Sequence, residues 1–154
     1  MSICFEPIGK VESEYKNPKD LIFACEKGIN TKTFSKIIID EKFEKGLCKL
    51  NEFSHIFVIY FLHQADKIEL ITHPGPPNEF DLPKVGVFAS RSQYRPNHIA
   101  LRLVKLQKIE KNVLFIEGLD AIDETNVLDI KPYVKGFDRP NEFKTAAWYD
   151  WLEK

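Results

Sequence analysis

The longest unbroken apolar run in the chain extends from Ile56 to Leu62, with the sequence IFVIYFL. A helix needs about 20 apolar residues to cross a bilayer, so this run is too short to span one. Its length favours a strand that is buried on both faces. The polar residues His63 and Gln64 follow it directly. We therefore expect a buried strand that ends in two polar side chains at the rim of a sheet.

Short apolar segments recur along the chain, and helical patterns between them are few. Residues 41–53 place apolar side chains at near-helical spacing, although Gly46 weakens this pattern. Residues 15–28 indicate a loop or a short helix, residues 74–83 contain four prolines and indicate a loop, and a helical tail is expected from Asn141. Further strands are expected at residues 5–12, 34–39, 67–72, 85–89, 99–108, 113–119 and 127–134. This pattern predicts a mainly β fold, most simply a barrel or a strongly curved sheet.

Length and charge narrow the class of protein. A chain of 154 residues suits a single domain with its own core. The net charge of −1 excludes a globally basic nucleic-acid-binding protein but leaves room for a local basic patch. Lysines near the N-terminus would supply such a patch, or else form an ordinary solvated surface: Lys16, Lys19, Lys27, Lys32 and Lys36.

The cysteines Cys4, Cys25 and Cys48 are odd in number and share no CxxC spacing, which is typical of reduced thiols in a cytosolic protein. The first residues lack a basic segment followed by an apolar core, so no secretory signal is expected. We therefore expect a cytoplasmic protein.

Several enzyme classes lack their motifs here. The chain has no GxGxxG after a strand and no GxxxxGK[ST], so neither a Rossmann dinucleotide site nor a P-loop is indicated. GxSxG and HExxH are also absent. No histidine pair has metal-ligand spacing beside a carboxylate, so no metal site is expected.

The segment from Gly86 to Leu106, GVFASRSQYRPNHIALRLVKL, places a dense polar loop between two apolar ends. A solvent-facing turn needs only a glycine, asparagine or proline for its geometry, and this loop carries far more polar chemistry than that. Pro96 stiffens it and pushes Arg95 into an extended conformation. Its composition fits a pre-shaped anion or ligand loop, or a surface hairpin with solvated arginines.

Two further groups of polar residues follow predicted buried strands. His63 and Gln64 would bind a ligand at a barrel rim, or satisfy loop backbone groups at a strand end. Asp120, Asp123 and Glu124 would hydrogen-bond a ligand, or pair with the loop arginines as plain salt bridges.

Four segments in order resemble those of the TrmO, or TsaA-like, tRNA methyltransferases. They are IGKVES, GLCKLNEFSHIFVIYFLHQ, GVFASRSQYRPNHIALRLVKL and GLDAIDETNVLDIKPYV, and they cover most of residues 5–135. The third and fourth resemble the family patterns GVFATRSPxRPNPIG and LDxxDGTPVLDIKPY. The resemblance implies a single β-barrel domain over residues 1–154 and a homodimer. It also implies an S-adenosylmethionine-dependent enzyme that methylates threonylcarbamoylated adenosine beside the anticodon of tRNA.

The resemblance also implies site residues. By motif, the cofactor would be bound by His63, Gln64, Arg91, Leu101, Gly118, Leu119 and Asp120. Tyr94, Arg95 and Asn97 would shape the pocket or face the substrate. Candidates for the base that accepts the proton of the methylated amine are His63, Asp120 and Asp123, which the sequence does not rank.

The chain departs from the family pattern inside these loops. Gln93, His98 and Ala100 replace proline, proline and glycine, and Glu124 and Asn126 replace glycine and proline. Two other functions therefore stay open: a methyltransferase acting on another substrate, and a cofactor-binding module without catalysis.

Overall fold

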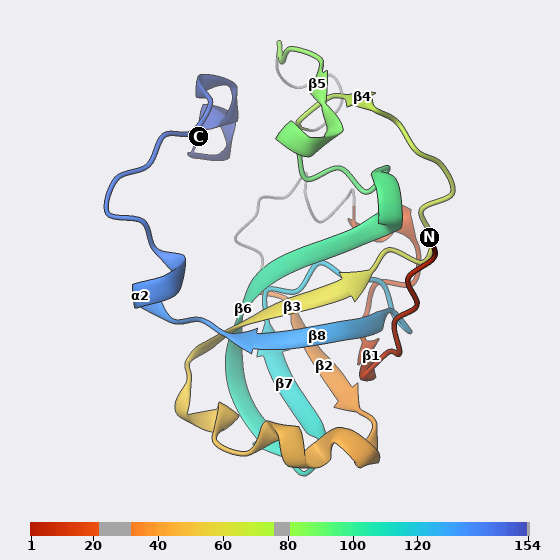
Figure 1. The fold of residues 1–154 in the computed structure, drawn as a ribbon, viewed down its shortest axis with the longest axis vertical. Coiled ribbons are helices and arrows are strands. Elements are labelled where there is room, and N and C mark those ends of the chain that lie inside the picture. The colour runs from red at the N-terminus through yellow and green to blue at the C-terminus, as the bar shows by residue number, and fades with distance from the viewer. Residues whose placement is uncertain (22–31, 76–80, 154) are drawn as a thin grey trace.

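The computed structural model describes residues 1–21, 32–75 and 81–153. Its centre is a closed antiparallel barrel, as the sequence predicts, with strand order β1-β2-β7-β6-β3-β8 (Figure 1). The barrel strands are β1 (Gly9–Glu12), β2 (Phe34–Ile39), β3 (His55–Phe61), β6 (Ile99–Glu110), β7 (Val113–Glu117) and β8 (Asn126–Pro132). Among the described residues no helix is long and apolar enough to cross a membrane.

The barrel closes at β1, which pairs with β2 on one side and with β8 on the other. Gly9 lies opposite Ile39 of β2 and opposite Val127 of β8. The strands approach so closely there that a Cβ atom on Gly9 would lie 2.4 Å from the carbonyl oxygen of Ile38. Glycine is therefore required at this seam for steric reasons.

The core fills the barrel interior with apolar side chains from alternate positions of each strand. Ile56, Val58 and Tyr60 of β3 point inward, whereas the residues between them are partly exposed. The other fully buried members come from the remaining strands and the loop after β7: Val11, Ile37, Ile39, Val104, Leu114, Ile116, Leu119, Ala121 and Val127.

One end of the barrel is covered by two 3-10 helices, η1 (Glu41–Leu47) and η2 (Leu50–Glu52), at the bottom of Figure 1. Phe43, Leu47 and Leu50 pack from them against the core. The near-helical spacing over residues 41–53 corresponds to two short 3-10 helices and not to one continuous helix. Lys49 takes a left-handed φ of 69° and separates the two short helices, so the helical hydrogen-bond pattern cannot continue.

A small lobe stands above the other end of the barrel (Figure 1). It contains the two-stranded sheet of β4 (Ile71–Thr72) and β5 (Val85–Gly86). The 3-10 helix η3 (Val87–Ala89) precedes the polar loop of residues 90–98, and η4 (Pro96–His98) forms the end of that loop. After the barrel come α2 (Lys135–Asp138) and η5 (Ala147–Glu153), where the Tyr149 hydroxyl donates a hydrogen bond to the Ala89 carbonyl at 3.3 Å.

Several predicted boundaries were too generous. The opening strand begins at Gly9 rather than at residue 5, and the strand expected at 67–72 is only β4. The strand expected at 85–89 turns into η3 because the Ser90 amide and hydroxyl both donate to the Val87 carbonyl. The helical tail begins at Ala147, and no regular element covers residues 141–146. Residues 18–21 are helical, whereas residues 22–31 and 76–80 lie outside the described part of the chain.

Candidate functional site

Three parts of the chain meet at the end of the barrel opposite η1 and η2. β3 ends there at Phe61, β6 begins there at Ile99, and residues 118–125 connect β7 to β8. The Leu62 amide donates a hydrogen bond to the His98 carbonyl at 2.8 Å, which ties the end of β3 to the polar loop. We call this end, with residues 60–64, 98–102 and 118–125, the barrel mouth.

A buried tyrosine holds a carboxylate at the barrel mouth. The Tyr60 side chain points into the barrel, and its hydroxyl donates a hydrogen bond to Asp120 Oδ1 at 2.8 Å. Burial, followed by the neighbouring charge of Asp120, raises the pKa of the Tyr60 hydroxyl far above its usual value. The hydroxyl therefore stays protonated and can act only as the donor in this pair.

An arginine completes this cluster. Arg102 Nε donates a hydrogen bond to the Gly118 carbonyl at 3.1 Å and lies 3.9 Å from Asp120 Oδ1. Sequence reasoning missed both Tyr60 and Arg102 because each is embedded in an apolar run, IFVIYFL or IALRLVKL. The available signal was alternation, since Arg102 shares the inward face of β6 with Val104 and Leu106.

The residues expected to bind a cofactor converge on the same end. The His63 Nδ1 and Thr125 Oγ1 atoms form a hydrogen bond at 3.3 Å, and Arg91 Nη1 donates to the Leu101 carbonyl at 3.4 Å. Gly118 takes a φ of 95°, which lets the chain turn from β7 toward Asp120.

For the other residues expected to bind the cofactor, the described part of the chain shows no side-chain hydrogen bond at the mouth. The Gln64 side chain is exposed at the end of β3, and no hydrogen bond to it from the described residues is seen. The Leu119 side chain belongs to the core, so only its backbone can face a ligand. The Leu101 side chain lies on the outer face of the barrel, where its residue pairs with Ile59.

The residues expected to face the substrate shape the polar loop itself. Arg95 donates from Nη1 to the Ser90 carbonyl at 3.2 Å and from Nη2 to the Val87 carbonyl at 3.5 Å. Its guanidinium thus stabilises the conformation of the loop through two backbone carbonyls. Tyr94 packs beside the small lobe, with Lys67 Nζ 4.5 Å from the centre of its ring.

The end of this loop has an unusual backbone. Asn97 and His98 both have positive φ values, 66° and 48°. A proline cannot adopt a positive φ, so the loop here differs in conformation from the family pattern, which has proline at position 98. His98 Nε2 lies 3.1 Å from the Lys67 carbonyl and must be the donor of that hydrogen bond.

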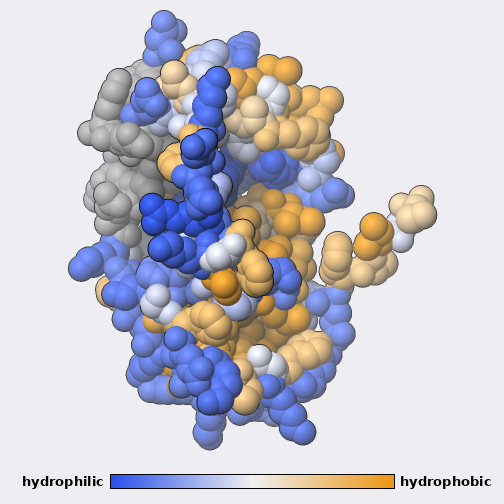
Figure 2. Space-filling view, turned by 60° about the vertical axis from the view of Figure 1, so that its left-hand side comes forward, coloured by the Kyte–Doolittle hydropathy of each residue, from blue (hydrophilic) through white to orange (hydrophobic). Residues whose placement is uncertain are grey.

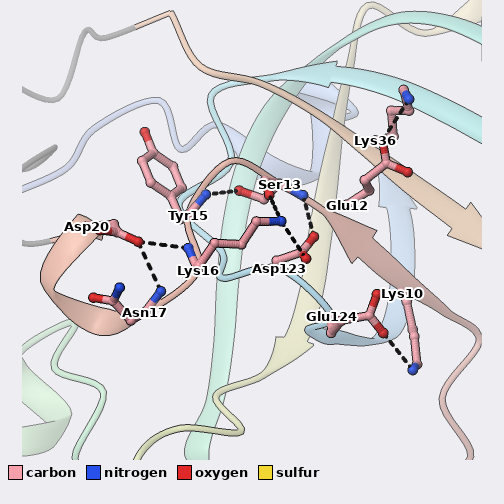
Figure 3. A network of polar contacts seen from close by, with 10 residues as sticks. All are labelled: Lys10, Glu12, Ser13, Tyr15, Lys16, Asn17, Asp20, Lys36, Asp123 and Glu124. Carbon is pink, nitrogen blue, oxygen red and sulfur yellow. Dashed lines mark hydrogen bonds and ion pairs between the residues drawn. The ribbon is translucent and has the colours of Figure 1, made fainter.

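The two carboxylates that follow Asp120 turn toward the N-terminal segment (Figure 3). Asp123 accepts hydrogen bonds from the Ser13 amide at 2.9 Å and from Lys16 Nζ at 2.6 Å. The Lys16 hydrogen bond is the main reason why the pKa of Asp123 is lowered. Glu124 pairs with Lys10 at 2.9 Å. Of the two alternatives left open for these carboxylates, pairing with Arg91 and Arg95 is therefore wrong, because the pairing of β1 with β8 brings lysines closer.

A shallow cavity of about 710 Å³ lies elsewhere, on the outer wall formed by β1, β2, β6 and β7. Its lysines form ion pairs: Lys36 pairs with Glu12 inside the cavity at 2.7 Å, whereas Lys16 and Lys108 pair with Asp123 and Glu110 outside its lining. None of the residues expected to bind the cofactor, face the substrate or act as base lines it. No group of three or more His, Cys, Asp or Glu side chains in the described ranges could hold a metal ion. We therefore assign the candidate site to the barrel mouth.

Beside the mouth, the outer face of β3 and β6 is apolar. Figure 2 shows hydrophobic side chains gathered over a broad area of the barrel wall and on the lobe above it. Ile99, Leu101 and Leu103 of β6 are 36%, 45% and 41% exposed, and Phe61 of β3 lies opposite Ile99. We call these four residues the outer apolar face.

Comparison with known proteins gives consistent matches. The family model "tRNA-methyltransferase O N-terminal domain" matches residues 10–139. A Pyrococcus abyssi protein described as a probable S-adenosyl-L-methionine-binding protein is 36% identical over the whole chain, which spans 78% of that protein. A mouse tRNA (adenine(37)-N6)-methyltransferase is 41% identical over 63% of the chain, which spans only 22% of that enzyme. The crystal structure of TrmO from Pseudomonas aeruginosa superposes with a TM-score of 0.72 at 26% identity, covering 96% of this chain and 63% of that one.

Proposed function

Because the chain belongs to the tRNA-methyltransferase O family, we propose that it is an S-adenosylmethionine-dependent enzyme that methylates an adenine amine in tRNA. The proposed acceptor is the threonylcarbamoylated adenosine beside the anticodon. The names of the mouse and Pyrococcus relatives support the reaction and the cofactor. The observation that carries the proposal is the convergence of His63, Arg91 and Asp120 at the barrel mouth.

The donor groups at the mouth fit this cofactor. A carboxylate, a guanidinium and an imidazole provide acceptors and donors for its polar ends. When bound, S-adenosylmethionine supplies a methyl group that forms an N–C bond with the acceptor amine as the S–C bond breaks and its electron pair stays on sulfur.

The enzyme's own residues must position the amine and accept the proton that leaves it. His63 and Asp120 are the better base candidates. Each keeps an atom, Nε2 or Oδ2, to which no hydrogen bond from the described residues is seen. Asp123 is a weaker candidate because Lys16 and Ser13 already occupy both of its oxygens.

Binding of tRNA requires a local basic patch, since the net charge is close to zero. Lys16 and Lys36 are paired with Asp123 and Glu12, which leaves them less available for phosphates. Lys19 and Lys32 are exposed and form no ion pair with the described residues, so we propose them as phosphate contacts. A tRNA acceptor would place the protein in the cytoplasm.

Two measurements test the proposed function. Calorimetry should show binding of S-adenosylmethionine, and absence of binding would overturn the enzyme assignment. Mass spectrometry of tRNA nucleosides from a deletion strain should show loss of the methylated threonylcarbamoyladenosine, with complementation by the intact gene as control. Cofactor binding with an unchanged nucleoside level would favour the other two functions, a different acceptor or a non-catalytic binding module.

We also propose that the chain forms a homodimer through the outer apolar face. Exposed apolar residues on neighbouring strands are costly in water and often mark a protein interface. Leu103→Glu should convert the dimer to a monomer in light scattering, whereas Ile38→Glu on the far wall should not. A monomeric wild-type protein would contradict this proposal.

A further inference from the structure

Arg102 occupies a position where a charge is unexpected. Its residue pairs with Val58, which is fully buried, and its neighbours on the same face of β6 are Ala100 and Val104. Charged side chains are rarely placed on an inward face unless a partner or a ligand compensates for their desolvation. The Arg102 side chain is 34% exposed, so it reaches from the inner wall to the solvent at the mouth.

The contacts of Arg102 use only one of its three nitrogens. Nε donates to the Gly118 carbonyl, and the closest approach to Asp120 is also through Nε. Within the described ranges, neither Nη atom donates a hydrogen bond to another residue. A guanidinium has a planar fork of donors that suits a carboxylate, and the outer half of this fork is free.

Asp120, like Arg102, uses only some of its polar atoms in hydrogen bonds to the described residues. Oδ1 accepts the Tyr60 hydroxyl and faces Arg102 Nε, whereas Oδ2 accepts no hydrogen bond from the part of the chain that the structure describes. The side chain is 46% exposed, so a ligand can reach it. The mouth therefore presents one free carboxylate oxygen and two free guanidinium nitrogens from neighbouring residues.

We propose that Asp120 and Arg102 bind the amino-acid end of the cofactor, with Asp120 Oδ2 accepting from its ammonium and Arg102 Nη atoms donating to its carboxylate. Asp120 Oδ2 is then occupied, so His63 is left as the base candidate at the mouth. The inference rests on the proposed function, because it takes S-adenosylmethionine as the ligand. An adjacent anionic and cationic group complement a zwitterion without leaving net charge in the site. Tyr60 is a positioning residue, since it touches no ligand and acts by fixing the orientation of the Asp120 carboxylate.

The test compares two ligands that differ only in this end. S-adenosylhomocysteine carries the amino-acid end, and 5′-methylthioadenosine lacks it. In calorimetry, Arg102→Met should weaken binding of S-adenosylhomocysteine by about tenfold or more, as expected for the loss of charge-assisted hydrogen bonds. Binding of 5′-methylthioadenosine should change by less than about twofold, within the scatter expected for a distant surface change. Arg139→Met, at an exposed arginine after α2, is the matched control and should change neither affinity.

Tyr60→Phe provides a second, milder variant that keeps the ring and removes only the hydroxyl. It should weaken S-adenosylhomocysteine binding by about fivefold, because the Asp120 carboxylate loses the hydrogen bond that fixes its orientation. It should have no further effect when Asp120→Asn is already present. Tyr133→Phe, at the opposite end of the barrel beside His55, is its matched control.

The outcomes distinguish a failure of the proposed function from a failure of the proposed zwitterion site. If wild-type protein binds neither ligand, the proposed function fails. If it binds both, but Arg102→Met leaves S-adenosylhomocysteine binding unchanged or weakens both ligands equally, only the zwitterion site is overturned. An additive effect of Tyr60→Phe and Asp120→Asn would overturn the positioning role of Tyr60.

Discussion

The two ends of the barrel are built from opposite chemistry. At the end covered by η1 and η2, Phe43, Leu47 and Leu50 pack against the core. At the mouth, inward positions of β3 and β6 carry Tyr60 and Arg102, which reach Asp120. β3 joins the two, because Ile56 lies near the covered end and Tyr60 at the mouth.

This difference suggests that the covered end contributes mainly to the stability of the fold and the mouth mainly to ligand binding. Apolar burial stabilises the fold without directing any group toward a ligand, whereas a half-exposed polar cluster adds little stability but offers free donors and acceptors. We therefore expect substitutions at the covered end to lower the free energy of unfolding and leave ligand affinity unchanged. Substitutions at the mouth should do the reverse.

The largest effect is expected from Ile56→Ala. The side chain is fully buried near the covered end, so its truncation should lower the free energy of unfolding by about 2–5 kcal/mol. Urea denaturation followed by circular dichroism measures this loss. S-adenosylhomocysteine affinity, measured below the unfolding transition, should stay at the wild-type value. A parallel loss of affinity would show that the two ends are coupled through β3.

The second largest effect is expected from Gly9→Ala, which should lower both stability and ligand affinity. The added Cβ would clash with the Ile38 carbonyl and push β1 from β2, at a cost of about 1–3 kcal/mol. β1 also holds the mouth, because the Glu124 amide donates to the Val11 carbonyl and the Val11 amide to the Thr125 carbonyl. Ligand affinity should therefore fall together with stability. Gly46→Ala in η1, where a Cβ meets open space, is the control that should change neither.

The third effect belongs to the mouth alone. Arg91 is exposed, and its one hydrogen bond to the described residues goes to the Leu101 carbonyl. Arg91→Ala should weaken S-adenosylmethionine binding about tenfold, or ~1.4 kcal/mol, with no change in the urea midpoint. Calorimetry and denaturation of the same preparation measure both quantities. Unchanged affinity in the folded variant would remove Arg91 from the binding site.

The sequence predicts the strands of the barrel wall better than the mouth. The strand at Phe34–Ile39 was predicted with its observed boundaries, and β3 differs by one residue at each end. These segments are readable because burial selects apolar residues by local periodicity. The mouth depends on contacts between distant segments. The partners of Asp123 and Glu124 could be identified only after β1 was known to pair with β8.

The cluster of Tyr60, Arg102 and Asp120 illustrates the same limit. Each residue alone has an ordinary explanation: an aromatic in a buried strand, a charge in an amphipathic strand, an acid in a loop. Their association follows from the register that places Val58 opposite Arg102 and Tyr60 opposite Ala100. Register is set by pairing between strands and is not visible in either strand by itself.

The smallest effect concerns the ion pair that ties the mouth loop to the N-terminal segment. Asn at position 123 can still accept from the Ser13 amide but loses the attraction of Lys16, so Asp123→Asn should cost about 0.5 kcal/mol at pH 7. The pKa of Asp123 is lowered in the folded protein from its usual 3.8, so its charge stabilises the fold above about that pH. This contribution is lost as the pH falls through the lower, folded-state pKa. The difference in unfolding free energy between wild type and variant should thus shrink in acid, as measured by denaturation at pH 7 and pH 3. A difference that persists unchanged at pH 3 would mean that the variant acts through the loop backbone and not through the charge of Asp123.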